Sequence, residues 1–305
     1  MAVYTPVTHS QLEAFIQNYN LGQLISFEGI MNGIDNSNFL ISTTLGNFIL
    51  TLFESLNSKQ LPDYLNLLIF LDKNNFTCPA PLANKQSEFL RSLNNKPAVI
   101  FKCLPGASII NPAVHHCHAI GEQLAKIHLC CLNHPFPINN NHNLLWCEKA
   151  WTTIQTQLNQ EDCLVLRDEI DFQLCFSPPV MPEGIIHGDL FRDNVFFLNQ
   201  KISGILDFYN ACTDYLLLDI AITINDWCLE NRKINSNKVN ALVSGYEKIR
   251  PLYDIEKQNL TVFLRRAALR FWLSRLDHQL NPKPGQITQT KNPSTFKNIL
   301  LQHRQ

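Results

Sequence analysis

Hydrophobic residues follow two different periods along the chain, and the change between them divides it into two parts. In roughly the first 100 residues they form short runs or alternate with polar residues over lengths typical of β-strands. Turn residues such as Leu45-Gly46-Asn47 separate these runs. The pattern predicts a small antiparallel sheet, with strands at LISFEGIM, NFLISTT, NFILTLFE, SEFLRSL and PAVIFKCL.

Helical signals accompany this sheet. Ser10 and Glu13 match a capping box, in which side chains bond the free N–H groups at the start of a helix. The run QLPDYLNLLIFLDKN has helical periodicity and places Pro62 near its start, where a missing N–H costs little. Pro105 and Gly106 then mark a turn suited to a hinge. We therefore expect a first lobe at residues 1–103.

From residue 104 to residue 305 the pattern is mainly helical. Ile120, Leu124 and Ile127 belong to an apolar stripe at the spacing of an amphipathic helix. A Pro-rich loop then leads into three strand-like runs, IIHGD, NVFFL and ISGILDF, before helical patterns resume. The sequence thus predicts an α+β fold with two lobes, the second mainly helical with a small β-insert. The stretch NPKPGQITQTKNPS near the end is predicted to be a turn or an ordered strap.

Charge and composition exclude several kinds of partner. A net charge of -1 gives no positive field for a phosphate backbone, so we expect no nucleic-acid partner. No run approaches the roughly 18 consecutive apolar residues of a membrane helix, and MAVYTPVTHSQLEAF lacks the features of a signal peptide. Ten cysteines without a C-x-x-C pair indicate a reducing compartment. We expect a cytoplasmic protein with no membrane partner, and the pattern gives no oligomeric state.

The β-insert carries the clearest chemical signal. His187, Asp189 and Asn194 fit the pattern H-x-D-x-x-x-x-N, and Asp207 closes the next strand. A loop can hold Asp189 against a substrate hydroxyl, while Asn194 and Asp207 converge as oxygen ligands for Mg²⁺ on nucleotide phosphates. We expect phosphoryl transfer, because this reaction needs positioning and charge neutralisation more than covalent chemistry from the protein. His187 is expected to brace the loop rather than react.

Some polar residues have simpler interpretations. Asp and Asn near strand ends often cap turns, and we interpret Asp193 in this way. The segment MNGIDNSNF, residues 31–39, is a candidate loop over the phosphates, because Gly33, Asn36 and Ser37 permit a tight turn whose N–H groups could meet phosphate oxygens. An ordinary hairpin turn explains the same three residues equally well.

Two further features suggest binding sites. Histidines and cysteines crowd residues 115–134, but helix spacing spreads the first four of them around the circumference, so we do not expect a zinc site. Arg265 shares the apolar face of Trp272 on a helical wheel. A charge on that face needs a partner, either a buried acid or a substrate carboxylate, and the pattern leaves both open.

Taken together, these motifs resemble one family, the homoserine kinases of the aminoglycoside-phosphotransferase and choline-kinase superfamily. The resemblance runs nearly end to end. It rests on the stretches MAVYTPVTHSQLEAFI, LISFEGIMNGIDNSNF, NFILTLFE, GEQLAKIHL, IIHGDLFRDNVFFL, GILDFYNACTDYLLLDIAITINDWC and RRAALRFWLSRL. It implies a bilobal, protein-kinase-like fold in which the first lobe binds nucleotide and the second is catalytic.

The resemblance also implies an activity: ATP-dependent O-phosphorylation of L-homoserine, a step of threonine biosynthesis, with ATP and Mg²⁺ as cofactors. It makes Asp189 the catalytic base or hydroxyl-orienting group, and Asn194 and Asp207 the Mg²⁺ ligands. Asp219 would support the catalytic loop.

Substrate contacts follow from the same resemblance. The hinge from Phe101 through Lys102 and Cys103 would hold adenine by backbone hydrogen bonds. Arg265 and Arg270 stand where the last long helix of the family also carries arginines. Because the planar guanidinium can bind both oxygens of a carboxylate, we expect these two arginines to bind the carboxylate of homoserine.

One departure bears on nucleotide binding. The run NFILTLFE lacks the lysine that many superfamily members place on their third strand to hold phosphates, and the homoserine kinases resemble this sequence in lacking it. Lys102 and Arg192 are candidate replacements. Two alternatives stay open: a kinase for another small alcohol or amine, such as choline, methylthioribose or an aminoglycoside, and a kinase-like module that binds nucleotide without transfer.

Overall fold

The computed structural model describes residues 3–30, 36–56, 58–281 and 291–305. These residues form two compact units. The first contains the described residues up to Pro105 together with Ser203–Ile205, and the second contains the others. The sequence pattern placed the boundary two residues earlier, at residue 103.

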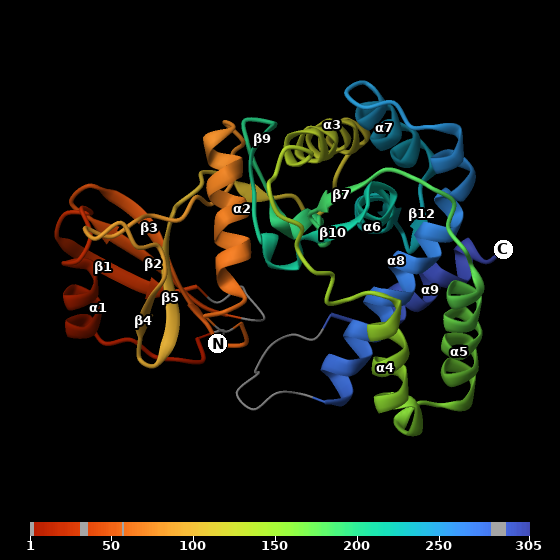
Figure 1. Ribbon diagram of the computed structural model, residues 1–305, viewed down its shortest axis with the longest axis horizontal. Helices are drawn as coiled ribbons and strands as arrows, with labels where there is room; N and C mark the ends of the chain where they lie inside the picture. Colours follow the sequence, from red (N-terminus) through yellow and green to blue (C-terminus); the bar gives the residue numbers. More distant parts are fainter. Residues whose placement is uncertain (1–2, 31–35, 57, 282–290) are drawn as a thin grey trace. The chain divides into compact units, whose positions relative to one another are not determined.

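The first unit is built on a five-stranded sheet in the order β1-β2-β3-β5-β4, in which all neighbouring strands are antiparallel (Figure 1). Each strand overlaps one of the five predicted runs, although β2 begins two residues before its run and β3 and β5 begin one residue before theirs. The strands are β1 (Leu24–Gly29), β2 (Asn36–Thr43), β3 (Gly46–Phe53), β4 (Arg91–Leu93) and β5 (Lys96–Lys102). Asn94 and Asn95 join β4 to β5 with positive φ angles of 50° and 62°, which asparagine tolerates better than most residues.

Alternation along the strands builds the core of this unit. Strand β2 alternates between half-buried and buried residues over its whole length, as a strand with one covered face requires. Its inward residues Phe39 and Ile41 pack with Leu50 and Leu52 of β3 and with Leu12 of helix α1. Helix α2 (Leu61–Lys73) buries a second apolar stripe and has proline in its first turn, as predicted.

Helix α1 (His9–Ile16) begins earlier than its predicted cap. Thr8 is the N-cap, and its side chain accepts a hydrogen bond from the Gln11 N–H at 3.3 Å. The Gln11 side chain accepts in return from the Thr8 N–H at 2.9 Å. The prediction of a box from Ser10 and Glu13 was therefore wrong, because Thr8 and Gln11 satisfy the same pattern two residues earlier.

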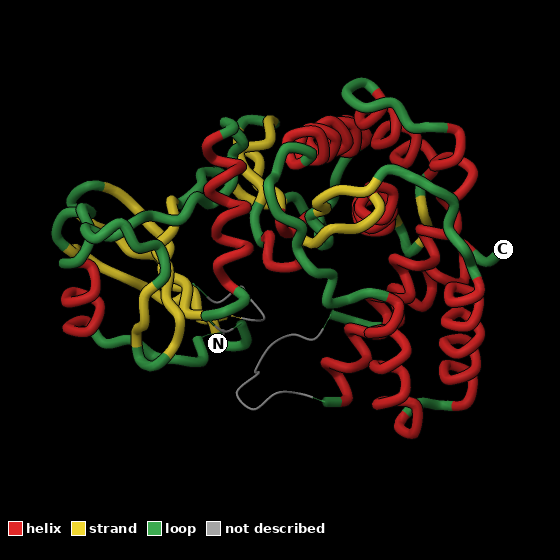
Figure 2. The backbone as a smooth tube through the Cα atoms, in the orientation of Figure 1, coloured by secondary structure: helices red, strands yellow, loops and turns green. Residues whose placement is uncertain are grey.

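The second unit is mainly helical (Figure 2). Its helices are α3 (Val114–Cys131), α4 (Leu144–Ile154), α5 (Gln160–Cys175), α6 (Leu216–Trp227), α7 (Ser236–Glu247), α8 (Asp254–Leu280) and α9 (Ser294–His303). Helix α8 contacts α4, α5, α6 and α9. Among the described helices, none is both long and apolar enough to cross a lipid bilayer.

Helices α3 and α7 approach each other closely at two glycines. A Cβ atom on Gly121 would lie 2.0 Å from the Leu242 carbonyl oxygen, and one on Gly245 would lie 2.1 Å from that of His118. Any larger side chain at either position would force the helices apart. The close packing sets His128 of α3 against Tyr246 of α7, at the base of the site described below.

The predicted β-insert is present in this unit. Strand β7 (Glu183–Ile186) pairs antiparallel with β10 (Cys212–Tyr215), and β6 (Ala107–Ser108) pairs antiparallel with β8 (Val195–Leu198). Strand β8 turns at residues 199–200 into β9 (Lys201–Ile205), whose last three residues belong to the first unit. The short remaining elements are the 3-10 turns Gln155–Gln157, Arg192–Asn194 and Phe208–Asn210 and the hairpin of β11 (Leu229–Glu230) and β12 (Lys233–Ile234).

Candidate active site

The loop from His187 to Asn194 joins β7 to β8 and contains three of the four predicted catalytic-site residues. It turns sharply at Gly188, whose φ of 74° is in the left-handed region. A Cβ atom there would lie 2.4 Å from the Asn210 carbonyl oxygen. Glycine at this position therefore permits both the turn and the close contact with the segment that follows Asp207.

Asp219 anchors the start of this loop from beneath. Its buried carboxylate accepts hydrogen bonds from the His187 N–H at 2.6 Å and from the Gly188 N–H at 3.0 Å. His128 Nε2 lies 3.1 Å from the same carboxylate, and His128 Nδ1 lies 2.7 Å from the Tyr246 hydroxyl. Burial opposes ionisation of Asp219, but the bond from His128, the nearby imidazoles and the His187 N–H outweigh it and lower the pKa of the carboxyl. Asp219 thus fixes the loop backbone.

The His187 side chain is fully buried and holds the two ends of the site together. Its Nε2 lies 2.8 Å from the Leu206 carbonyl oxygen, and its Nδ1 accepts from the Asp189 N–H at 3.2 Å. Burial lowers the pKa of the imidazole, which keeps the ring neutral with its proton on Nε2. These contacts fit a bracing role.

Asn194 and Asp207 are brought together by the strands that carry them. The Leu206 N–H donates to the Asn194 carbonyl oxygen at 2.8 Å, which sets the next residue, Asp207, beside Asn194. The Asn194 side-chain amide donates to the Asp189 carbonyl oxygen at 2.9 Å. Asp207 adopts a left-handed backbone with φ 60° and ψ 59°, which costs energy for a residue other than glycine. Strained backbone of this kind is frequent at functional sites.

The two aspartates of the site repel each other. Burial and then the negative charge of Asp207 raise the pKa of Asp189 well above its usual value, while the charges of Lys291 and Arg270 oppose that rise. A bound cation near Asp207 would relieve this repulsion. The site residues thus fit a divalent metal ion electrostatically.

The ligand set is also that of a hard cation. Asn194 Oδ1 and the Asp207 carboxylate are oxygen donors of the type Mg²⁺ prefers. Within the described part of the chain, no cluster of three or more His, Cys, Asp or Glu side chains could hold a metal ion. A metal at this site would therefore complete its coordination with water and with phosphate oxygens of a nucleotide, as Mg²⁺ commonly does.

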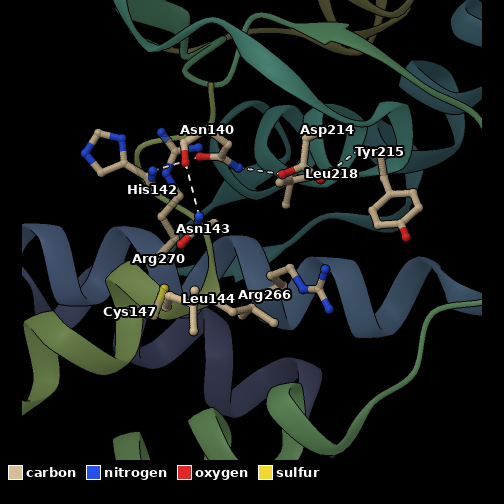
Figure 3. Close-up of a pocket in the computed structure, with 11 residues that line it drawn as sticks. Asn140, His142, Asn143, Leu144, Cys147, Asp214, Tyr215, Leu218, Arg266 and Arg270 are labelled. Atoms are coloured by element: carbon tan, nitrogen blue, oxygen red, sulfur yellow. Dashed lines mark hydrogen bonds between the residues drawn. The ribbon is translucent and has the colours of Figure 1, made fainter. Parts of the chain in front are cut away.

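A pocket of about 320 Å³ is lined by residues of α4, β10 and α8, and Figure 3 shows its lining. Its residues come from the loop before α4, from α4 itself, from the β10–α6 junction and from α8. They are Asn140, His142, Asn143, Leu144, Leu145, Cys147, Asp214, Tyr215, Leu218, Arg266 and Arg270. Among these, Asp214 is the only acidic side chain.

Arg270 is the most unusual residue of this pocket. Its side chain rises from α8 towards Asn140 and His142 (Figure 3) and is only 4% exposed. Its Nη1 is buried without a hydrogen-bond partner among the described residues. Burial of an unsatisfied charged donor is costly, and such a group is a ready receiver for an anion. The positive charge also acts on Asp189, so the pocket and the catalytic loop are electrostatic neighbours.

Arg265 has a different environment. Its guanidinium binds the fully buried carboxylate of Glu169 on α5, with a shortest distance of 2.7 Å, and stacks 3.6 Å from the ring centre of Phe172. Of the two partners that the sequence left open for Arg265, the structure supplies the buried acid. Arg265 does not line the pocket, and its predicted contact with a substrate has no support in these contacts.

The residues predicted to hold nucleotide lie in the first unit. Gly33 lies outside the described residues. The Ser37 hydroxyl is buried and accepts from the N–H groups of Tyr4 and Thr5 while it donates to Glu54 at 2.6 Å. Asn36 Oδ1 accepts from the Glu54 N–H at 3.4 Å. Both side chains therefore tie the start of β2 to its neighbours.

The predicted hinge begins within the last two residues of β5. Phe101 is buried, and the Lys102 N–H already donates to the Ala80 carbonyl oxygen at 3.1 Å. Cys103 is the first residue beyond the strand and is exposed. Its backbone groups are the best placed of the three for a hinge contact.

The two cations suggested as replacements for the absent lysine have other partners. Lys102 pairs with Asp72 at 3.2 Å. Arg192 pairs with Asp226 at 3.2 Å and donates to the Ile110 carbonyl oxygen at 2.9 Å. The Arg192 guanidinium is therefore satisfied without a phosphate, whereas the Lys102 ammonium is in an exposed ion pair.

Three residues near the site were not singled out from the sequence: Asn140, Asp214 and Lys291. Asn140 Nδ2 donates to Asp214 Oδ2 at 2.5 Å across 74 residues of sequence, and Lys291 Nζ lies 2.5 Å from Asp193 Oδ2 across 98 residues. No local pattern carries such contacts. In the sequence, each of the three is only a polar residue in a short strand or loop, and such residues are common at protein surfaces.

The chain is similar to known proteins over its whole length. Residues 26–252 match the phosphotransferase enzyme family. A homoserine kinase of Methylobacillus flagellatus is 38% identical over 98% of this chain and 94% of its own length. One of Xanthobacter autotrophicus is 40% identical over 100% of this chain and 96% of its own.

Solved structures share the fold at low sequence identity. An amicoumacin kinase in complex with AMP-PNP and Ca²⁺ is similar with a TM-score of 0.73 at 12% identity, over 98% of this chain and 92% of that chain. A choline kinase from Cryptosporidium parvum gives a TM-score of 0.69 at 16% identity, over 97% of this chain and 95% of that chain. The predicted kinase-like α+β fold is confirmed.

Proposed function

Since the chain belongs to the homoserine kinases of the phosphotransferase enzyme family, we propose that it transfers the γ-phosphoryl group of ATP to the side-chain hydroxyl of L-homoserine. The product would be O-phospho-L-homoserine, the intermediate that the family supplies to threonine biosynthesis. Similarity over the whole chain supports this assignment. The observation that carries it is the approach of Asn194 and Asp207 to Asp189 around one rigid loop.

Asp189 orients the acceptor hydroxyl and takes its proton. Its raised pKa suits this role, because a carboxylate that binds protons more tightly is a stronger base once it is ionised. His187 and Asp219 act only through the loop: they hold the backbone on which Asp189 stands. General base catalysis of this kind typically contributes about 10²- to 10⁴-fold to the rate.

Asn194 and Asp207 would hold Mg²⁺. The metal, when bound, neutralises charge on the nucleotide phosphates. For the nucleotide itself, the best-placed hinge group is the backbone of Cys103, next to Phe101 and Lys102. We extend the proposal to an adenine contact at this hinge and to a phosphate loop at residues 31–39.

The pocket beside the loop is suited to the other end of homoserine. Arg270 offers an unsatisfied, buried guanidinium for the substrate carboxylate. Asp214, the only acid in the described lining, is held by the Asn140 amide and by the Tyr215 N–H at 2.7 Å, and we assign it the substrate ammonium. A zwitterion needs both charges, and pairing inside a partly dry pocket gives selectivity against substrates that lack either one.

A substrate panel tests this function. An assay of ADP formation would contain Mg²⁺-ATP and, in turn, L-homoserine, L-serine, choline and an aminoglycoside. We expect kcat/KM for homoserine to exceed the others by about 100-fold or more, because serine is one methylene short and the other two lack a carboxylate for Arg270. Preferred turnover of choline or the aminoglycoside would contradict the assignment. Nucleotide binding without any turnover would instead indicate a kinase-like binding module.

A further inference from the structure

Lys291, on the C-terminal segment, places a positive charge on the catalytic loop. Its Nζ lies 2.5 Å from Asp193 Oδ2 and 5.2 Å from the ring centre of Phe191. Both partners are in the middle of the loop, between Asp189 and Asn194. The charge of Lys291 is also the first of those that oppose the raised pKa of Asp189. The ammonium is thus close to the reacting centre although it is about 100 residues away in sequence.

The segment that carries Lys291 is anchored directly after the lysine. Arg275 Nη1 of α8 donates to the Asn292 carbonyl oxygen at 3.0 Å, and Asn292 Oδ1 accepts from the Ser294 N–H at 2.9 Å, next to the start of α9. In the first turn of α9, Phe296 stacks on Phe191 of the catalytic loop with ring centres 5.9 Å apart. These contacts fix where the lysine backbone stands with respect to the loop.

The ammonium is nevertheless available to a ligand. The Lys291 side chain is 41% exposed, and that of Asp193 is 50% exposed. An ion pair this exposed contributes little stability, because water solvates both charges almost as well when they are apart. Lys291 can therefore leave Asp193 for a more highly charged anion at small cost.

Phosphoryl transfer in this chain requires such a cation. Strand β3 has no lysine, and Arg192 is held by the less exposed Asp226 and by the Ile110 carbonyl oxygen. The transition state spreads negative charge over three equatorial oxygens, and cations placed beside them supply much of the catalysis. A γ-phosphoryl group located between Asp189 and the oxygens of Asn194 and Asp207 would lie over the loop that Lys291 reaches.

We propose that Lys291 donates to the γ-phosphoryl group of ATP and stabilises it through transfer, as a further catalytic residue. The inference rests on the proposed kinase function. In the step, the bond from the γ-phosphorus to the β–γ bridging oxygen breaks and a bond from the substrate hydroxyl oxygen forms. The hydroxyl proton passes to Asp189, ADP leaves with the bridging oxygen, and Lys291 keeps its proton throughout.

The test compares Lys291→Met with Lys297→Met. Lys297 is a matched control on the adjoining helix, where it pairs with Glu161 at 2.8 Å and Asp162 at 2.6 Å. We expect Lys291→Met to lower kcat about 100-fold with a nearly unchanged KM for homoserine, Lys291→Arg to recover part of that loss, and Lys297→Met to match the wild type. Asp193→Asn removes the ion pair but keeps the lysine. If Lys291 acts on the phosphate and not through the ion pair, kcat should fall much less in Asp193→Asn than in Lys291→Met.

Calorimetric binding of ATP and ADP provides a readout that does not depend on the acceptor. We expect Lys291→Met to lower the affinity for ATP about tenfold more than the affinity for ADP, because only ATP carries the γ-phosphate. An unchanged ATP-to-ADP affinity ratio, or equal losses of kcat in Asp193→Asn and Lys291→Met, would overturn the proposal. Should the wild type fail to phosphorylate homoserine, the affinity ratio still decides the role of Lys291, so the two failures are distinguishable.

Discussion

Arg265 and Arg270 stand five residues apart on one helix, and their environments differ. Arg265 is saturated by Glu169, whereas Arg270 has a buried Nη1 without a partner in the described structure. The sequence identified both arginines but could not separate them, because the acid that distinguishes them comes from α5, 96 residues away. Charge on an apolar helix face shows that a partner exists, and only the tertiary structure shows which one.

Removal of the guanidinium from the pocket should affect homoserine and spare a neutral analogue. In Arg270→Met we expect the KM for homoserine to rise roughly 10- to 100-fold, the range for loss of a hydrogen bond to a charged group. With homoserinol, which lacks the carboxylate, wild type and variant should differ little. Steady-state kinetics with both substrates measure this. An equal loss with homoserinol would mean that Arg270 supports the fold instead.

Asp214 should show the complementary behaviour. Asp214→Asn keeps the size of the side chain and removes its charge, so the KM for homoserine should rise by roughly tenfold or more. With 4-hydroxybutyrate, which lacks the ammonium, the wild type should turn over poorly and the variant no worse. Comparison of kcat/KM for the two acids in each protein is the measurement. If the variant discriminated between them as strongly as the wild type, the ammonium would bind elsewhere.

At the scale of elements, the sequence predicted most of the strands and helices but not the exact residues at which they end. All five strands of the first sheet overlap the runs that periodicity predicted, and α2 and α3 contain the two helical stripes. The start of α1 was missed because two overlapping pairs, Thr8 with Gln11 and Ser10 with Glu13, fit the same pattern. Support of the catalytic loop by Asp219 was expected from the family resemblance, but the contacts of His128 with Asp219 and with Tyr246 could not be predicted, since they span 91 and 118 residues.

The anchoring acid gives a stability prediction. Asp219→Asn replaces a carboxylate that accepts from two backbone N–H groups with an amide that can accept at one atom only. We expect a loss of about 3 kcal/mol, or about 10 °C in Tm, and a marked fall in kcat from the loosened loop. Thermal denaturation followed by circular dichroism measures the first effect. Asp254→Asn, at an exposed site on α8, is the control and should cost under about 1 kcal/mol.

Helix α9 introduces a pH dependence through His303. Its Nε2 lies 2.8 Å from Asn225 Oδ1 of α6, and burial lowers its pKa to about 4, below the usual 6.5. Because the unfolded chain then binds the proton first, this contribution to stability is complete above about pH 6.5 and is lost as the pH falls towards 4.

His303→Gln removes the titrating group and isolates its share. Between pH 7 and pH 4.5 the free energy of unfolding should fall less in the variant than in the wild type, by an amount on the order of 2 kcal/mol. Denaturant unfolding at several pH values measures the difference. Parallel curves for the two proteins would show that His303 is not buried as the structure has it.

At the scale of the whole molecule, fold and family were accessible from sequence because they depend on patterns spread along the chain. The H-x-D-x-x-x-x-N motif and the strand order of the insert are local, and they led to Asp189, Asn194 and Asp207 directly. The pocket acid and the cation from the C-terminal segment were not accessible, because residues far apart in sequence assemble them. The residues to which we assign the chemical step are therefore close together in sequence, whereas those to which we assign substrate recognition come together only in the tertiary structure.

The central claim is phosphoryl transfer to the hydroxyl of homoserine directed by Asp189, and ³¹P NMR of the reaction tests it most directly. Wild-type protein with Mg²⁺-ATP and L-homoserine should produce ADP and a phosphomonoester resonance split by the two adjacent methylene protons. Asp189→Asn should form that ester at least about 10²-fold more slowly. Inorganic phosphate as the only product, or an undiminished rate in Asp189→Asn, would contradict the account.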